Sequence, residues 1–200
     1  MRPYAVLIGG IACLAAFSIA RPAGAQAGSG SGAEAPDPVA RATIRACATG
    51  QPLGTAVLRE QASDEGVKEV DVRVRITRRN TVLTEGEHGV HIHEVGDCSQ
   101  ACAAALGHFD PGPNGNPSPD GNHPFHLGDL INLEIGANGR GVLRTTSSRF
   151  TVSPGVLSVL DANGSALMIH ALEDTYCPNG PAMNCAGGPR VACGVIERAR

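Results

Sequence analysis

The segment His88-Gly89-Val90-His91-Ile92-His93-Glu94 places two histidines two residues apart, with a β-branched isoleucine between them. Along a β-strand, side chains two residues apart point to the same face. On a helix, the same two side chains would diverge by about 200°. The spacing of His91 and His93 therefore favours a strand that presents two imidazoles side by side. A strand with two solvated histidines gives the same pattern, so the rest of the chain has to distinguish a metal site from an exposed surface.

The remaining histidines favour the metal site. All seven lie between His88 and His170. Several stand in short polar settings that are typical of ligands, namely Gly107-His108-Phe109-Asp110, His123-Pro124-Phe125-His126-Leu127-Gly128-Asp129 and Met168-Ile169-His170. Nitrogen ligands alone suit Cu(II), and nitrogen together with a carboxylate suits Zn(II). The chain offers both kinds of ligand set.

The composition limits the class of protein. A length of 200 residues suits one domain with a substantial core. The net charge of −3 and the absence of tryptophan argue against nucleic acid as a partner. The 26 glycines and 14 prolines favour short strands joined by turns over long helices.

Residues 1–25 are typical of a secretory signal peptide. Arg2 provides a positive start, residues 4–20 are almost wholly apolar or small, and Ala23-Gly24-Ala25 fits a cleavage site. The alternatives are a membrane anchor, for which the apolar run is at the lower length limit, and a lipoprotein attached at Cys13. We expect residues 26–39 to form a flexible linker and residues 40–200 to form the domain of a periplasmic or secreted protein.

Hydrophobic periodicity predicts a series of short strands. The clearest is 67–77, where apolar and charged residues alternate from Val70 onward, as in a half-buried strand with a charged outer face. Asn-Gly pairs at 138–139 and 163–164 predict hairpin turns. The other expected strands are 42–46, 54–58, 89–94, 130–135, 141–146, 156–160, 166–171 and 190–196.

Two long irregular segments, 96–128 and 173–189, interrupt the predicted strands. A long loop inside a compact domain is usually functional or disordered. The histidines and cysteines of the first segment indicate that metal and disulfides fasten it. With no convincing helix, the pattern predicts an antiparallel sandwich or barrel.

The cysteines that follow the signal segment are even in number, which favours disulfides in an exported protein. Spacing alone does not choose among the many pairings that they allow. They are Cys47, Cys98, Cys102, Cys177, Cys185 and Cys193.

Five motifs in this order resemble the copper/zinc superoxide dismutases over about residues 40–197. They are the 88–94 segment, Gly107-His108-Phe109-Asp110-Pro111, His126-Leu127-Gly128-Asp129-Leu130, Ile169-His170 and Arg190-Val191-Ala192-Cys193-Gly194-Val195-Ile196. The resemblance implies an all-β Greek-key barrel or sandwich of about eight antiparallel strands with two long functional loops. It also implies an oxidoreductase that converts superoxide to dioxygen and hydrogen peroxide, at a redox-cycling copper with a neighbouring zinc.

The resemblance implies two adjoining metal sites. His91, His93 and His170 resemble copper ligands, and His108 resembles the imidazolate that bridges copper and zinc. His126 and Asp129 resemble zinc ligands.

One zinc ligand departs from the family pattern. The family places another histidine between His108 and His126, where family spacing falls on Asn116 or Pro117 in this chain. His123 is the only histidine in that interval. It is either the substitute ligand or a loop histidine without a role, so the prediction of zinc depends on it.

The resemblance also implies supporting roles. Asp174 resembles the carboxylate that orients ligands of both metals, and Arg190 resembles the arginine that binds a small anion at the channel mouth. His88 resembles a structural histidine, because three residues before His91 it would face away from the pair.

Cys193 matches one half of the family's disulfide, and its partner is either Cys98 or Cys102, with bacterial-type features favouring Cys98. The pairing of the other cysteines stays open: one possibility is a small loop closed by Cys177 and Cys185, and nothing beyond arithmetic pairs Cys47 with Cys102.

Two other functions remain open from the sequence. One is a copper-only dismutase whose long loop is held by disulfides, and the other is a non-catalytic copper-binding module on the same fold. The expected partner is superoxide, with no nucleic acid and no membrane after signal cleavage. The sequence leaves open whether the protein forms a homodimer.

Overall fold

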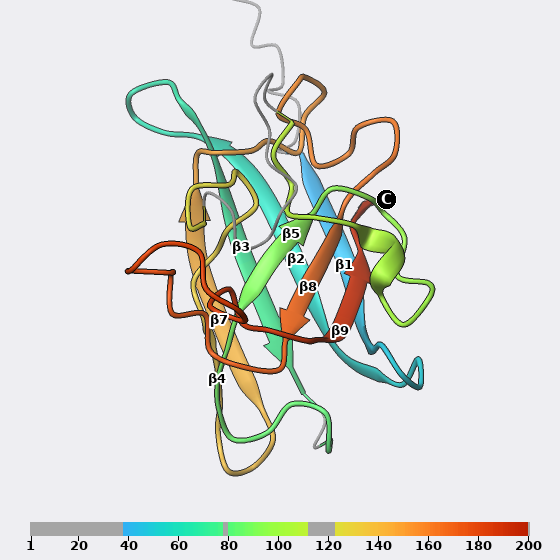
Figure 1. Ribbon diagram of the computed structural model, residues 1–200. Helices are drawn as coiled ribbons and strands as arrows, with labels where there is room; N and C mark the ends of the chain where they lie inside the picture. The colour runs from blue at the N-terminus through green and yellow to red at the C-terminus, as the bar shows by residue number, and fades with distance from the viewer. Residues whose placement is uncertain (1–37, 78–79, 112–122, 200) are drawn as a thin grey trace, which may run out of the picture. The chain divides into compact units, whose positions relative to one another are not determined.

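The computed structural model describes residues 38–77, 80–111 and 123–199 (Figure 1). The expected signal peptide (1–25), residues 26–37 of the expected linker, and Asn116 and Pro117 lie outside the described residues. Within the described ranges, no helix is both long enough and apolar enough to span a membrane.

The regular secondary structure of the described residues is β-strand, apart from one short 3-10 turn at Ala103–Ala105. Every pairing between its strands is antiparallel. The strands are β1 (Val39–Ala46), β2 (Pro52–Ala62), β3 (Lys68–Ile76), β4 (Gly86–His88), β5 (Val90–His93), β6 (Leu133–Ile135), β7 (Gly141–Ser147), β8 (Ala166–His170), β9 (Arg190–Val195) and β10 (Glu197–Arg198).

The sheet is closed almost completely by the chain itself. Its order is β4-β6-β7-β3-β2-β1-β9-β8-β5, with β10 paired to β1. β4 and β5 stand at opposite ends of this order, yet only Gly89 separates them in sequence. A side chain at Gly89 would bring a Cβ to 3.1 Å from the Cβ of Asp174, so glycine permits the close approach here. The result is a near-closed antiparallel barrel, which confirms the predicted all-β class.

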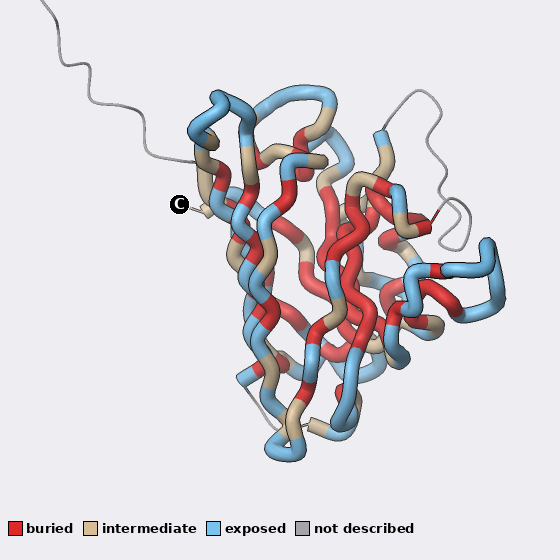
Figure 2. The backbone as a smooth tube through the Cα atoms, turned by 90° about the vertical axis from the view of Figure 1, so that its left-hand side faces the viewer, coloured by how far each residue is buried: buried red, intermediate tan, exposed pale blue. Residues whose placement is uncertain are grey.

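The barrel core follows from period-two alternation. In β3, Val70, Val72, Val74 and Ile76 are buried, and the charged residues between them are exposed. The same alternation of buried and exposed residues runs along the long strands in Figure 2. Complete burial of an aliphatic side chain stabilises the fold by about 1.5–3 kcal/mol. This core fixes the strands on which the histidines stand.

Two details of the predicted strands are wrong. The segment 156–160 is not a sheet strand, and its pairing is an isolated bridge between Thr151 and Ser158. Val156 is 87% exposed, and Val159 is buried in the core. The second Asn-Gly pair joins no two strands of the sheet, because no strand directly precedes it; it lies in a turn in which the N–H of Gly164 donates to the carbonyl of Asp161. The first pair does connect two strands, β6 and β7.

Candidate metal centre

The candidate site forms where β5 and β8 pair and two loops cross them. His91 and His93 lie on β5, and His170 ends β8. β5 pairs with β8 in antiparallel register, and Figure 1 shows these strands side by side with β9. A bridge between His93 and His108 and another between His91 and Asp129 hold the loop residues against β5.

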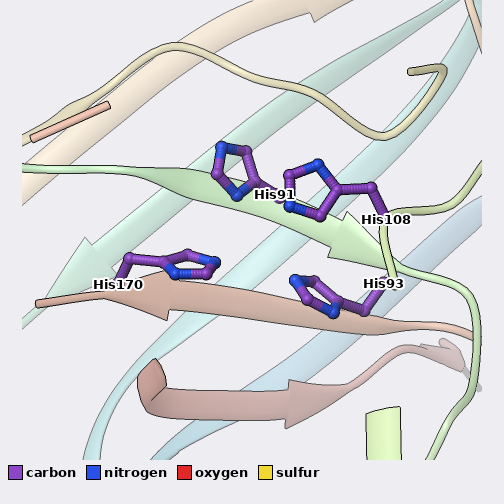
Figure 3. A group of neighbouring side chains, drawn as sticks. All are labelled: His91, His93, His108 and His170. Carbon is purple, nitrogen blue, oxygen red and sulfur yellow. The ribbon is translucent and has the colours of Figure 1, made fainter. Parts of the chain in front are cut away.

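Four buried histidines form the first cluster, and their rings point toward one another in Figure 3. One candidate ligand atom from each ring lies within 4.8 Å of all the others. The atoms that have no hydrogen-bond partner among the described residues are Nδ1 of His91 and Nε2 of His93, His108 and His170.

The second nitrogen of each ring in this cluster is hydrogen-bonded, which orients the ring. Nδ1 of His93 donates to the carbonyl of Leu106 at 2.8 Å, and Nδ1 of His170 donates to the carbonyl of Gly188 at 2.7 Å. A carbonyl only accepts, so the proton sits on Nδ1 and the lone pair on Nε2. This is the arrangement in which a histidine binds a metal ion.

Burial keeps these rings neutral. It lowers the pKa of His108 to about 4 and the pKa of His170 to about 3. It also lowers the pKa of His93 well below its usual range. Neutral imidazole is the form that binds a metal ion. The cluster is therefore prepared for a cation at neutral pH without first losing protons from these three rings.

The second cluster consists of histidines that surround the carboxylate of Asp129. Its Oδ1 lies 2.6 Å from Nδ1 of His108, and its Oδ2 lies 3.1 Å from Nδ1 of His126 and from Nδ1 of His123. Candidate ligand atoms of Asp129, His91, His108 and His123 lie within 4.8 Å of one another, and His126 falls outside that group. His108 therefore faces Asp129 with Nδ1 and the first cluster with Nε2.

His123 is buried beside two carboxylates. Its Nε2 lies 2.9 Å from Oδ1 of Asp174, and its Nδ1 has no aligned hydrogen-bond partner among the described residues. Burial lowers its pKa, but the close contacts with the carboxylates of Asp129 and Asp174 outweigh burial and raise the pKa to about 9. Burial likewise raises the pKa of Asp129, and its hydrogen bonds to the histidines hold that pKa far below the usual range. A cation placed here would displace the proton of His123.

Asp174 connects the two clusters through its carboxylate, which lies 2.8 Å from Nε2 of His91 and 2.9 Å from Nε2 of His123. Its backbone is held by Asn132, whose Nδ2 donates to the carbonyl of Asp174 and whose Oδ1 accepts from its N–H, both at 2.9 Å. Sequence reasoning missed Asn132, because no motif marks a loop asparagine that contacts main chain 42 residues away.

Arg190 begins β9 and reaches the loop that precedes His108. Its Nη1 donates to the carbonyl of Cys102 at 3.0 Å, and its Nη2 donates to the carbonyl of Leu106. The same carbonyl of Leu106 accepts from His93. The guanidinium therefore lies one peptide group away from the first cluster.

His88 is separate from both clusters. Its Nδ1 faces the carbonyl of His170 at 2.8 Å and its Nε2 faces the carbonyl of Thr84 at 3.0 Å. Neither nitrogen is left for a metal ion, in agreement with a structural role.

Disulfides fasten the first long loop to the barrel and close a small loop within the second. Cys98 joins the first long loop to β9 through Cys193, at a Cα–Cα distance of 5.8 Å. The other disulfides in the described residues are Cys47–Cys102 and Cys177–Cys185. Of these pairs, the sequence favours Cys98–Cys193 and leaves the other two open.

The described residues fit a pair of metal ions. Six buried ring nitrogens have no hydrogen-bond partner there, and each of these rings directs its other nitrogen at a carbonyl or carboxylate oxygen. An unpaired buried polar atom costs about 1–3 kcal/mol, so the fold would not retain so many without a ligand. The antiparallel barrel therefore carries two adjoining groups of candidate metal ligands, which have His91 and His108 in common.

The chain belongs to the copper/zinc superoxide dismutase family of oxidoreductases, whose sequence model matches residues 53–196. It is 42% identical to a Cu-Zn superoxide dismutase of Legionella pneumophila over 125 residues, which cover 62% of this chain and 70% of the relative. It is 34% identical to that of Photobacterium leiognathi over 160 residues, covering 74% and 81%. The crystal structure of a SOD-like protein from Bacillus subtilis is similar at 27% identity and a TM-score of 0.58, covering 78% of this chain and 96% of that one.

Proposed function

We propose that this protein is a superoxide dismutase that binds copper and zinc at the two adjoining clusters. The copper ligands would be His91, His93, His108 and His170, and the zinc ligands would be His108, His123, His126 and Asp129. The observation that carries the proposal is the set of six buried ring nitrogens without hydrogen-bond partners in the described residues. Membership of the family supports the same reading.

The reaction would convert two superoxide anions and two protons to dioxygen and hydrogen peroxide. When bound, copper would supply a one-electron redox couple, and zinc would supply fixed charge and geometry.

Arg190 would bind the substrate anion. The whole chain carries a net charge of −3, which disfavours the approach of a small anion. Arg190 supplies a positive charge beside the carbonyl that it shares with His93. Electrostatic steering of this kind has superoxide dismutase among its standard examples.

His108 would accept and release a proton at Nε2. Its Nδ1 lies 2.6 Å from Asp129, which fixes the ring while Nε2 faces the first cluster. Burial lowers the pKa of this ring to about 4 in the metal-free protein, so the ring is neutral at neutral pH and its Nε2 has a free lone pair. Asp174 would hold His91 and His123 in place throughout.

We also propose that the protein works in the periplasm or outside the cell. Three disulfides within the described residues support this, because such bonds persist in oxidising compartments.

The test is to load metal-free protein with copper alone, with zinc alone and with both, and to measure bound metal per chain and the rate of superoxide dismutation. Both metals should bind, and activity should require copper. Copper binding without activity would instead identify a non-catalytic copper-binding module. Activity with copper, and no zinc bound at saturation, would identify a copper-only dismutase.

A further inference from the structure

Arg149 contacts the loop that carries the proposed zinc ligands His126 and Asp129. Its Nη1 donates to the carbonyls of His126 at 3.0 Å and Pro124 at 3.3 Å, and its Nη2 donates to the carbonyl of Asp129. One guanidinium therefore holds the main chain at three points in six residues. Two of these points are residues whose side chains are assigned to zinc.

The barrel holds Arg149 itself in place. Arg149 lies two residues after the end of β7, and its backbone N–H donates to Oγ of Ser147 at 3.2 Å. The next residue, Phe150, is completely buried in the core. The side chain thus extends from a rigid base to a loop that forms no strand between Pro124 and Asp129.

The loop has few other connections that fix these carbonyl groups. Its other main-chain hydrogen bonds run from Gly128 to Phe109, from Ile92 to Gly128, and from Asp129 to His126. None of them holds the carbonyl of Pro124 or of Asp129. The planar guanidinium has five N–H donors in a fixed fork, so it can hold several carbonyls at once, and the single ammonium of a lysine cannot reproduce that geometry.

We propose that Arg149 is a positioning residue for the second metal site. It fixes the main chain of His126 and Asp129, so that their side chains are set before the ion arrives. The inference rests on the proposed zinc site. A positive charge near a cation site opposes binding, so the benefit of Arg149 must come from geometry. Loss of the geometric role would therefore weaken zinc binding, whereas loss of the charge alone would strengthen it.

The test compares zinc affinity in copper-free wild type, Arg149→Ala and Arg149→Lys, by competition with a chelating dye. Arg144→Ala is the matched control, because Arg144 is an exposed arginine of β7 in the same chain segment. Loss of a residue that orients metal ligands commonly costs ~10–100-fold in affinity. Both Arg149 variants should show a loss in this range, and Arg144→Ala should match wild type. Copper affinity, measured separately, should change much less.

Other results would overturn the inference. Equal zinc affinity in wild type and Arg149→Ala would make Arg149 a purely structural residue, even if the metal-free variant unfolds at a lower temperature. Tighter binding in Arg149→Ala would show that charge dominates. Full affinity in Arg149→Lys would show that the fork is not needed, and this variant also serves if Arg149→Ala fails to fold. If wild type itself binds no zinc, the proposed zinc site is wrong and the inference fails with it.

Discussion

Oδ2 of Asp174 lies 2.8 Å from Nε2 of His91, and both side chains are fully buried. The other oxygen of the same carboxylate lies 2.9 Å from Nε2 of His123. One side chain therefore orients a proposed ligand of each metal. It comes from the loop after β8, whereas His91 is part of the barrel and His123 belongs to a separate loop.

Replacing this carboxylate should weaken both metal sites. Asp174→Asn keeps the size but leaves one acceptor oxygen for two ring N–H groups. We expect a loss of ~10–100-fold in affinity for each metal, larger for zinc because His123 has no strand to hold it. Competition titrations with each metal measure this, with the exposed neighbour variant Glu173→Gln as the control. Wild-type affinities in Asp174→Asn would contradict the orienting role.

Removing His123 should affect zinc selectively. His123→Ala should lower zinc occupancy by at least the ~10–100-fold typical of an orienting residue, because a direct ligand is lost. Copper should stay largely bound, since none of the four proposed copper ligands is changed. Metal analysis of the purified variant measures both ions. Identical zinc content in variant and wild type would make His123 a bystander.

The charge of Arg190 should act mainly on substrate encounter. Steering raises on-rates by ~10–10³-fold and weakens with salt. Arg190→Glu should therefore cut dismutation at low salt by roughly one to two orders of magnitude, within that range, with copper still bound. Wild-type activity should fall as ionic strength rises, and the variant should show a flat or reversed dependence.

Arg190→Lys separates charge from contact. Lysine keeps the charge and loses the fork that reaches the carbonyls of Cys102 and Leu106. It should retain the wild-type direction of salt dependence. If wild type and Arg190→Glu show the same dependence of activity on salt, Arg190 does not steer the substrate anion.

The metal-free protein should be most stable near neutral pH. The pKa values of His108 and His170 are lowered by burial to about 4 and about 3, and that of His93 is lowered as well. Below their unfolded pKa near 6.5 the unfolded chain binds more protons, so the free energy of unfolding should fall with falling pH. The pKa of His123 is raised to about 9 despite burial, by Asp129 and Asp174. The contribution of protonated His123 to the free energy of unfolding is complete below pH 6.5 and is lost as the pH rises through about 9.

Denaturant titrations of the metal-free protein with its disulfides intact, between pH 5 and 9, measure this dependence. A free energy of unfolding that increases steadily on acidification would contradict the burial of neutral rings. One that is constant from pH 6.5 to 9 would contradict the charged pairing of His123 with the two carboxylates.

The sequence was most informative where local pattern controls structure. Alternation in β3 and the spacing of His91 and His93 depend on strand geometry alone, and both strands are present. It failed for 156–160, where Val159 is buried but the backbone bonds to Thr151 instead of a sheet. A short apolar run has the same sequence pattern whether it forms a sheet strand or an irregular segment.

The supporting residues of the site were harder to find in the sequence. His123 lies close to Asp129 and Asp174, and its position in the sequence does not predict these contacts. Asn132 and Arg149 act through main-chain carbonyl and N–H groups. Such contacts leave no spacing rule in the sequence, so only the three-dimensional arrangement shows them.

We propose that the four-histidine cluster binds the copper that dismutates superoxide. The most direct test measures bound copper and dismutation rate in the same preparations of wild type and His93→Ala. The wild type should hold stoichiometric copper with a type 2 spectrum and be active, and His93→Ala should lose copper and nearly all activity. Unchanged activity in His93→Ala would contradict the account.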